Sequence, residues 1–201
     1  VSYSNNDSTI FANSNIGLYD GKNEFVKLTD KTFLTKIDSS GSKLTLESST
    51  IWYFMPQKIS IALDSVIVKL FSSDINKNPT IITSDSLSFF EDSNFVASQK
   101  NVTINQDSLT IYAPNALMWR NFGKALLFHG VTIKEPHWTL FSDTVIVYFE
   151  KDEIRTVFLI GNPRGKWHDP MDSLRLTEDS RFSSDTMLFS FSDGKVIGAE
   201  L

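Results

Sequence analysis

The sequence contains no cysteine, few glycines and prolines, and no long hydrophobic run. Without cysteine, the chain can form neither disulfides nor cysteine-based zinc sites, and thiol catalysis is excluded. Nine glycines and six prolines in 201 residues exclude collagen-like repeats and flexible linkers. No segment reaches the roughly 18 consecutive apolar residues of a membrane-spanning helix. What is left is ordinary globular composition, with 41% hydrophobic and 21% charged residues.

Concentrated positive charge is also missing. The net charge is −5 and no basic run occurs, so we expect no nucleic-acid partner. The three histidines, His129, His137 and His168, lack the helical spacing of a zinc site and have no cysteine to assist them. The sequence therefore predicts neither a metal site nor a cofactor.

The first residues are polar and do not form a signal peptide. Because the sequence begins with Val1 and not with methionine, we expect that a preceding export signal or anchor has been removed. The lack of one here is then uninformative.

Phenylalanine is the enriched residue, with 16 copies, and small polar residues fill the remaining positions. Aromatic and β-branched residues suit pleated strands, and small polar ones suit turns. The clearest run of strands lies between His129 and Pro163. Its short apolar segments, Val131 to Lys134, Trp138 to Phe141 and Val145 to Phe149, are bounded by Pro, Asp and Gly, as in an antiparallel meander.

A small polar step recurs along the chain, each time followed by an alternating apolar strand, at spacings of 29 to 42 residues. The steps are Asn13-Ser14-Asn15, Ser48-Ser49-Thr50, Ser84-Asp85-Ser86, Ala113-Pro114-Asn115, Ser142-Asp143-Thr144 and Ser184-Asp185-Thr186. Such a period indicates a repeat architecture. Within Ile59 to Phe71 the alternation changes phase at Asp64-Ser65, which predicts a β-bulge or bend.

Each repeat carries one apolar face that it cannot bury alone, and the step would let the strand bend so that the sheet folds over itself. Two facing sheets then enclose an apolar interior about 10 Å thick. We predict an all-β fold and a single domain over residues 1–201: an antiparallel β-jellyroll or V-shaped open β-sandwich built from repeated hairpins. Arg164 to Asp172 is interpreted as a polar insertion.

Asp85, Asp143 and Asp185 suggest two interpretations. Paired carboxylates could serve glycoside hydrolysis. Their recurrence at one position of the repeat favours bends instead, because Asp side chains bond to nearby backbone. We therefore predict no catalytic residues and no enzymatic activity.

The repeat resembles the OstA-type lipopolysaccharide-transport proteins (LptA, LptC and the periplasmic part of LptD). The matching stretches are Gly130-Val131-Thr132-Ile133, Leu140 to Tyr148, Gly161-Asn162, Phe182 to Phe189 and Asp193-Gly194-Lys195-Val196. The resemblance implies a periplasmic β-jellyroll whose apolar groove carries the acyl chains of lipopolysaccharide or another lipid during outer-membrane assembly. It also implies that edge strands join other jellyroll proteins, or further copies of the chain, end to end.

Two sets of residues become candidates for these roles. The groove set alternates on one side of its strands and contains Ile51, Tyr53, Leu87, Phe89, Met118, Val145, Val147, Met187 and Phe189. A dry core would use the same residue types. The edge set contains Ile10, Ile16, Leu18, Val196 and Ile197, since exposed edges can pair with another strand. The alternative function is a carbohydrate-binding or adhesion module, with Trp119, Trp138 and Trp167 as stacking platforms.

Overall fold

A computed structural model describes residues 2–4, 8–38, 43–71, 77–150, 153–167, 180–192 and 195–200, and in these residues the only helix is a short 3-10 turn. The strands are β1 (Ser2–Ser4), β2 (Ser8–Asn13), β3 (Ile16–Asp20), β4 (Phe25–Asp38), β5 (Lys43–Phe54), β6 (Ile59–Phe71), β7 (Thr80–Phe90), β8 (Phe95–Gln106), β9 (Leu109–Trp119), β10 (Lys124–Glu135), β11 (Trp138–Glu150), β12 (Glu153–Ile160), β13 (Arg164–Trp167), β14 (Ser180–Ser183), β15 (Thr186–Ser192) and β16 (Lys195–Glu200). The 3-10 turn, η1, spans Arg120–Phe122. The predicted all-β fold is confirmed.

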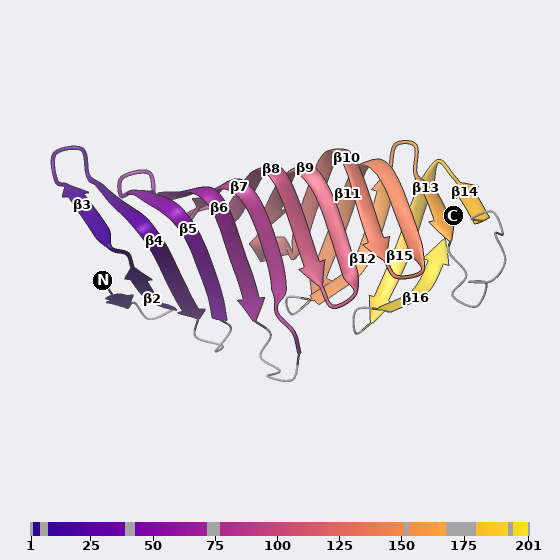
Figure 1. Cartoon of the computed structure of the whole chain (residues 1–201), viewed down its shortest axis with the longest axis horizontal. Coiled ribbons are helices and arrows are strands. Elements are labelled where there is room, and N and C mark those ends of the chain that lie inside the picture. Colours follow the sequence, from indigo (N-terminus) through magenta and orange to yellow (C-terminus); the bar gives the residue numbers. More distant parts are fainter. Residues whose placement is uncertain are drawn as a thin grey trace.

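All these strands belong to one antiparallel sheet, and from β4 to β12 they follow one another in chain order. Figure 1 shows this order, from the N-terminal end on the left to the C-terminal end on the right. At the ends the sheet splits: β3 pairs β4 beside β2, and β13 pairs β11 beside β12. Repeated hairpins thus build an open sheet, as the sequence predicts.

The long strands bend near their middles, which divides the sheet into two facing halves. Half A contains β3, β12, β15, β16 and residues 25–29, 50–54, 59–63, 86–90, 95–99, 115–119, 124–128 and 144–150. Half B contains β1, β2, β13, β14 and residues 32–38, 43–48, 66–71, 80–84, 102–106, 109–113, 131–135 and 138–142. The line of bends joins the halves, and the hairpin turns form a rim on each side.

Pairs of residues with positive φ make the bends, one pair on every second strand. The pairs are Asp30-Lys31, Asp64-Ser65, Lys100-Asn101, His129-Gly130 and Gly161-Asn162. Left-handed conformations interrupt strand pairing and increase the local twist. At Asp64-Ser65 the register between β6 and β7 shifts, which confirms the predicted bulge.

The recurrent polar steps lie opposite these pairs. At four of the steps the first serine donates its hydroxyl to the backbone carbonyl two residues further on: Ser14, Ser48, Ser84 and Ser142, with Oγ–O distances of 2.9 to 3.1 Å. A small hydroxyl side chain can make this bond within the bend and so satisfies a carbonyl that the interrupted ladder leaves free. The small polar residue recurs in the repeat because its side chain bonds to the backbone at the bend.

Candidate functional site

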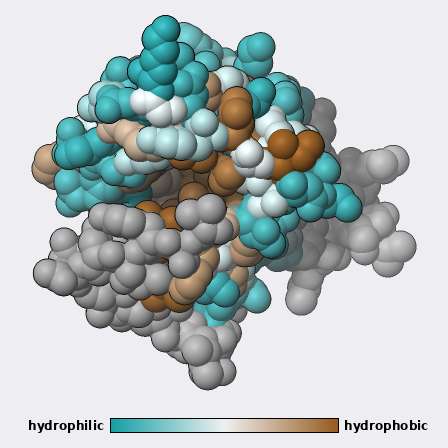
Figure 2. All heavy atoms as spheres, turned by 90° about the vertical axis from the view of Figure 1, so that its left-hand side faces the viewer, coloured by the Kyte–Doolittle hydropathy of each residue, from teal (hydrophilic) through white to brown (hydrophobic). Residues whose placement is uncertain are grey.

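An apolar cavity lies between the two halves in the N-terminal part of the sheet, with a volume of about 120 Å³. Seen from the N-terminal end in Figure 2, hydrophobic residues line a hollow beneath a more polar outer surface. Half A contributes Ile51, Ala62, Leu87, Phe89, Val96 and Met118 to the lining, and half B contributes Leu34, Leu44, Leu46, Val68, Leu70 and Ile82. The alternation of the strands sends every second side chain into this space.

The structure divides the predicted groove set between two environments. Ile51, Leu87, Phe89 and Met118 line the cavity. Tyr53 is half-buried and pairs with Ser60 of the lining, but is not itself part of it. Val145, Val147, Met187 and Phe189 lie in the C-terminal part of the core, where they are 0%, 0%, 1% and 5% exposed. Contact of any of these residues with lipid stays a prediction.

Aromatic packing closes the C-terminal part of the interior. Trp138 of half B stacks on Phe189 of half A, with ring centroids 5.7 Å apart and planes 16° from parallel. Phe191 lies 6.5 Å from the same indole ring. Trp138 is 4% exposed. In the C-terminal part of the sheet, its ring fills the space between the halves that is an open cavity between β2 and β9.

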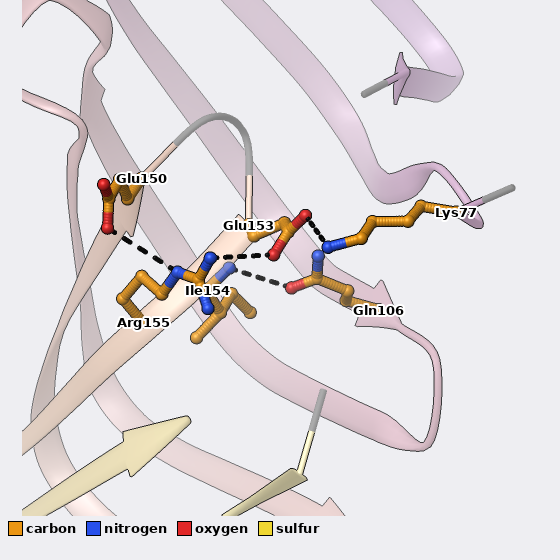
Figure 3. A network of polar contacts seen from close by, with 6 residues as sticks. All are labelled: Lys77, Gln106, Glu150, Glu153, Ile154 and Arg155. Atoms are coloured by element: carbon orange, nitrogen blue, oxygen red, sulfur yellow. Dashed lines mark hydrogen bonds and ion pairs between the residues drawn. The ribbon is translucent and has the colours of Figure 1, made fainter. Parts of the chain in front are cut away.

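A polar cluster bridges the halves at the rim, and we call it the clasp: Lys77, Gln106, Glu150, Glu153 and Arg155 (Figure 3). The Gln106 side-chain oxygen accepts a hydrogen bond from the Ile154 backbone N–H at 2.9 Å. The Glu153 carboxylate contacts Lys77 Nζ on one oxygen and Arg155 Nη2, at 3.2 Å, on the other. Because Glu153 is largely buried, these contacts are less screened than surface pairs.

Charged side chains also line the open cavity, which the sequence pattern did not identify. Lys36 of half B, Glu91 in the turn after β7, and Arg120 of η1 contribute to its lining. Lys36 Nζ lies 5.9 Å from the centre of the Phe89 ring, across the gap between the halves. These residues combine cations with an otherwise apolar wall. In the sequence, these three charged residues share only one feature that could have marked them: each lies close to the end of a strand.

Two of the three aspartates of the polar steps, Asp85 and Asp143, bond to the neighbouring strand. Asp85 accepts hydrogen bonds from Asn101 Nδ2 at 3.1 Å, and Asp143 accepts one from Asn162 Nδ2 at 2.9 Å. Each bond joins a step to the positive-φ pair on the neighbouring strand. This geometry supports the interpretation of these aspartates as bend residues rather than paired catalytic acids.

Two of the three histidines lie among the described residues. The His129 ring nitrogen Nδ1 lies 3.1 Å from Asn115 Nδ2, and the His137 ring lies 6.3 Å from the Trp167 ring. His168 lies outside the described residues. In the described part of the chain, no three acidic or histidine side chains gather where they could hold a metal ion.

The predicted edge residues occupy three different settings. Ile16 and Leu18 lie on β3, which pairs only with β4 among the described strands, and are 60% and 54% exposed. Ile197 on the terminal strand β16 is 68% exposed, whereas Val196 packs against the core. Ile10 differs from the prediction, because β2 lies between β1 and β4 and its side chain lines the cavity.

The three tryptophans of the alternative carbohydrate site do not form one platform. Trp138 is buried between the halves, and Trp119 packs 5.3 Å from Phe95 on the outside of half A. Trp167, at the end of β13, is 46% exposed. A sugar could not stack on all three, so the arrangement does not favour that alternative.

Among the described residues, no helix has the length and hydrophobicity needed to span a bilayer. The sequence matches no protein-family model, and no curated protein matches it. Among solved structures, the chain is similar to the crystal structure of LptH, described as the LptA homologous periplasmic component of the conserved lipopolysaccharide transport device from Pseudomonas aeruginosa. The TM-score is 0.46, with 12% identity, over 55% of this chain and 75% of LptH. That degree of likeness assigns neither a family nor a ligand to the chain.

Proposed function

We propose that this protein is a non-enzymatic carrier or bridge for lipopolysaccharide or another acylated lipid in the periplasm. The observation that carries the proposal is the apolar cavity between the two halves, lined from both sides by aliphatic side chains and Phe89. The resemblance of the repeated steps to lipopolysaccharide-transport proteins supports the same conclusion.

The mechanism is passive shielding. An acyl chain that leaves water for the cavity gains about 0.8 kcal/mol per buried CH₂ group. The cavity volume of about 120 Å³ is similar to the roughly 150 Å³ of an apolar cavity that binds one benzene molecule. The cavity thus holds a segment of one chain, and the rest of a lipid extends through its opening.

Three charged residues make part of the cavity wall polar. Lys36 and Arg120 supply two cations beside an apolar wall, and Glu91 supplies one anion. A phosphorylated lipid would place its chain against the wall and its phosphate near the cations. Directional movement would come from a partner. The edges of β3 and β16 that no other described strand pairs would join neighbouring jellyroll domains by strand pairing.

Site-specific photo-crosslinking tests the proposal, with an azide-bearing phenylalanine analogue in place of Phe89 or Phe189 and radiolabelled lipopolysaccharide as the probe. Both residues were predicted to line a groove, but only Phe89 lines the open cavity. We expect label at Phe89 and little at Phe189. A third variant places the analogue at Tyr112, which is 43% exposed on half B. Label at Tyr112 equal to that at Phe89 would reject the cavity as the binding site.

A further inference from the structure

The two outer rows of half A nearest the turns are largely apolar, although a solvated sheet face is normally polar. Phe90, Trp119 and their neighbours alternate with inward residues such as Phe89 and Met118, so they point away from the cavity. In the row nearest the turns, cross-strand partners include Phe25, Phe54, Phe90, Phe95, Trp119 and Tyr148. The next row includes Trp52, Ile61, Leu117, Leu126, Ile146 and Phe158.

The outer surface of half B is the internal control for this observation. In the second row from its turns, Thr35, Thr45, Lys69, Asn105, Thr110, Lys134 and Thr139 surround a single apolar residue, Ile81. The row next to the bends is mixed, with Phe33, Ile67, Tyr112 and Phe141 among Glu47, Thr83, Thr103 and Thr132. An antiparallel sheet that covers a core on one face and meets water on the other has a polar outer side. The two rows of half A nearest the turns are more apolar than these rows of half B, which favours a cover other than water on that part of the outer face of half A.

The aromatic rings on half A contact one another across the strands. Phe25 lies 5.2 Å from Trp52, and Phe95 lies 5.6 Å from Phe90 and 5.3 Å from Trp119. Two lysines interleave with them. Lys27 Nζ lies 4.6 Å from the Trp52 ring, and Lys124 Nζ lies 5.7 Å from the Tyr148 ring.

The apolar face and the cavity share one rim. Trp119 belongs to the outer row and is the last residue of β9. Arg120 follows it and lines the cavity, and Phe122 in the same 3-10 turn as Arg120 is 77% exposed. A phenylalanine this exposed at a turn has no packing role within the described chain. It extends the aromatic surface beyond the sheet.

We propose that the outer face of half A lies on the surface of a lipid bilayer. Tryptophan, tyrosine and lysine combine an apolar body with a polar end and are the residues that settle at the boundary between headgroups and acyl chains. The more polar outer face of half B would then point to water, as in other proteins that bind a membrane from one side. The contact would place the shared rim, and with it the cavity, beside the lipid.

This inference goes beyond the proposed carrier function, because it concerns the outer face and not the occupancy of the cavity. Vesicle binding reports on the outer face, whereas cross-linking at Phe89 reports on the cavity. Either can fail while the other succeeds.

Quenching by brominated lipid tests the orientation. The chain has four tryptophans, of which Trp52 and Trp119 lie on the outer face of half A. Trp138 is buried, and Trp167 lies in half B. With phosphatidylcholine vesicles whose acyl chains carry bromine, we expect tryptophan emission to be quenched. In the double variant W52F/W119F, vesicles should still bind but quenching should be lost. Quenching that persists in this variant would overturn the proposed orientation.

A second pair of variants tests the contact itself by co-sedimentation with the same vesicles. Because Phe122 is largely exposed, Phe122→Ser leaves the fold intact and should weaken vesicle binding about tenfold. Tyr112→Ser, on the outer face of half B, should leave binding unchanged. If the wild-type chain does not sediment with vesicles, or if it forms dimers that Phe122→Ser dissociates in the absence of lipid, the bilayer proposal is overturned.

Discussion

The substitution Trp138→Ala tests what closes the C-terminal part of the interior. The indole ring spans from half B to half A, stacks on Phe189 and contacts Phe191, and only 4% of the residue is exposed. Removing it takes away the aromatic contact that joins the two halves there. It also leaves a space that the surrounding strands cannot fill, because each is fixed in the sheet by two neighbours.

The expected cost follows from the size of the ring and its burial. Replacing a buried tryptophan by alanine costs about 3–5 kcal/mol, through lost burial and the cavity that remains. Stacked aromatic pairs contribute about 0.5–1.5 kcal/mol beyond their area. We expect the free energy of unfolding to fall by about 4 kcal/mol. In the same variant the cavity should extend toward β15 and accept an apolar probe that the wild-type chain excludes from this region.

Urea unfolding followed by far-UV circular dichroism measures the first effect, and fluorescence of an added apolar dye measures the second. Trp119→Ala is the matched control: this tryptophan also packs on a phenylalanine, but on the half-exposed outer face. It should cost about half as much or less. A loss below about 1 kcal/mol for Trp138→Ala, or equal losses for both variants, would refute the closed C-terminal core.

Three further substitutions test the clasp, the bends and the close packing of β13. Glu153→Ala should cost about 1–3 kcal/mol in urea unfolding, because it leaves two cations without their largely buried partner, and 1 M NaCl should reduce the difference from wild type. Ser142→Ala should cost about 1 kcal/mol, since its hydroxyl reaches the carbonyl oxygens of Thr144 and Ile160; an unchanged unfolding midpoint would reject this role for the step. Gly165→Ala should lower the thermal midpoint, because an added methyl group would overlap the Phe182 ring; Gly198→Ala, with no close neighbour, should have little effect.

The recurrent steps could be predicted from sequence because their cause is local. A serine that bonds to a carbonyl two residues away must lie at the bend, so the residue type marks the position. The strands themselves run further than the pattern suggests. Trp138–Glu150 is one bent strand and not two short ones, and the predicted polar insertion begins with the strand Arg164–Trp167.

The division of the interior could not be predicted, because it depends on contacts between distant residues. Phe89 and Phe189 follow the same alternation in sequence, yet one lines an open cavity and the other lies beneath Trp138. The clasp joins Lys77 to Glu153 across a separation of 76 residues, and no local pattern marks such a pair.

The apolar outer face of half A did have a signal in the sequence. Runs such as Ile51 to Phe54 and Ala116 to Trp119 are continuously apolar, whereas a strand with one wet face alternates. Continuous runs are typical of strands that are covered on both sides. The runs follow the polar step in the repeat and therefore all fall in half A, which concentrates the apolar surface on one side of the molecule.

The closed C-terminal part also constrains the proposed carrier. A bridge that passes lipid from end to end needs a continuous interior. Beyond β9, however, the Trp138 ring occupies the space between the halves, and the clasp bonds the two halves to each other. Among the described residues, a lipid bound as proposed would therefore enter and leave where the cavity opens, between β2 and β9. If lipid does cross the whole chain, the clasp must release first, and Glu153→Ala should then speed lipid transfer while it lowers stability. If transfer is unchanged in that variant, lipid exchange through the open part alone is sufficient.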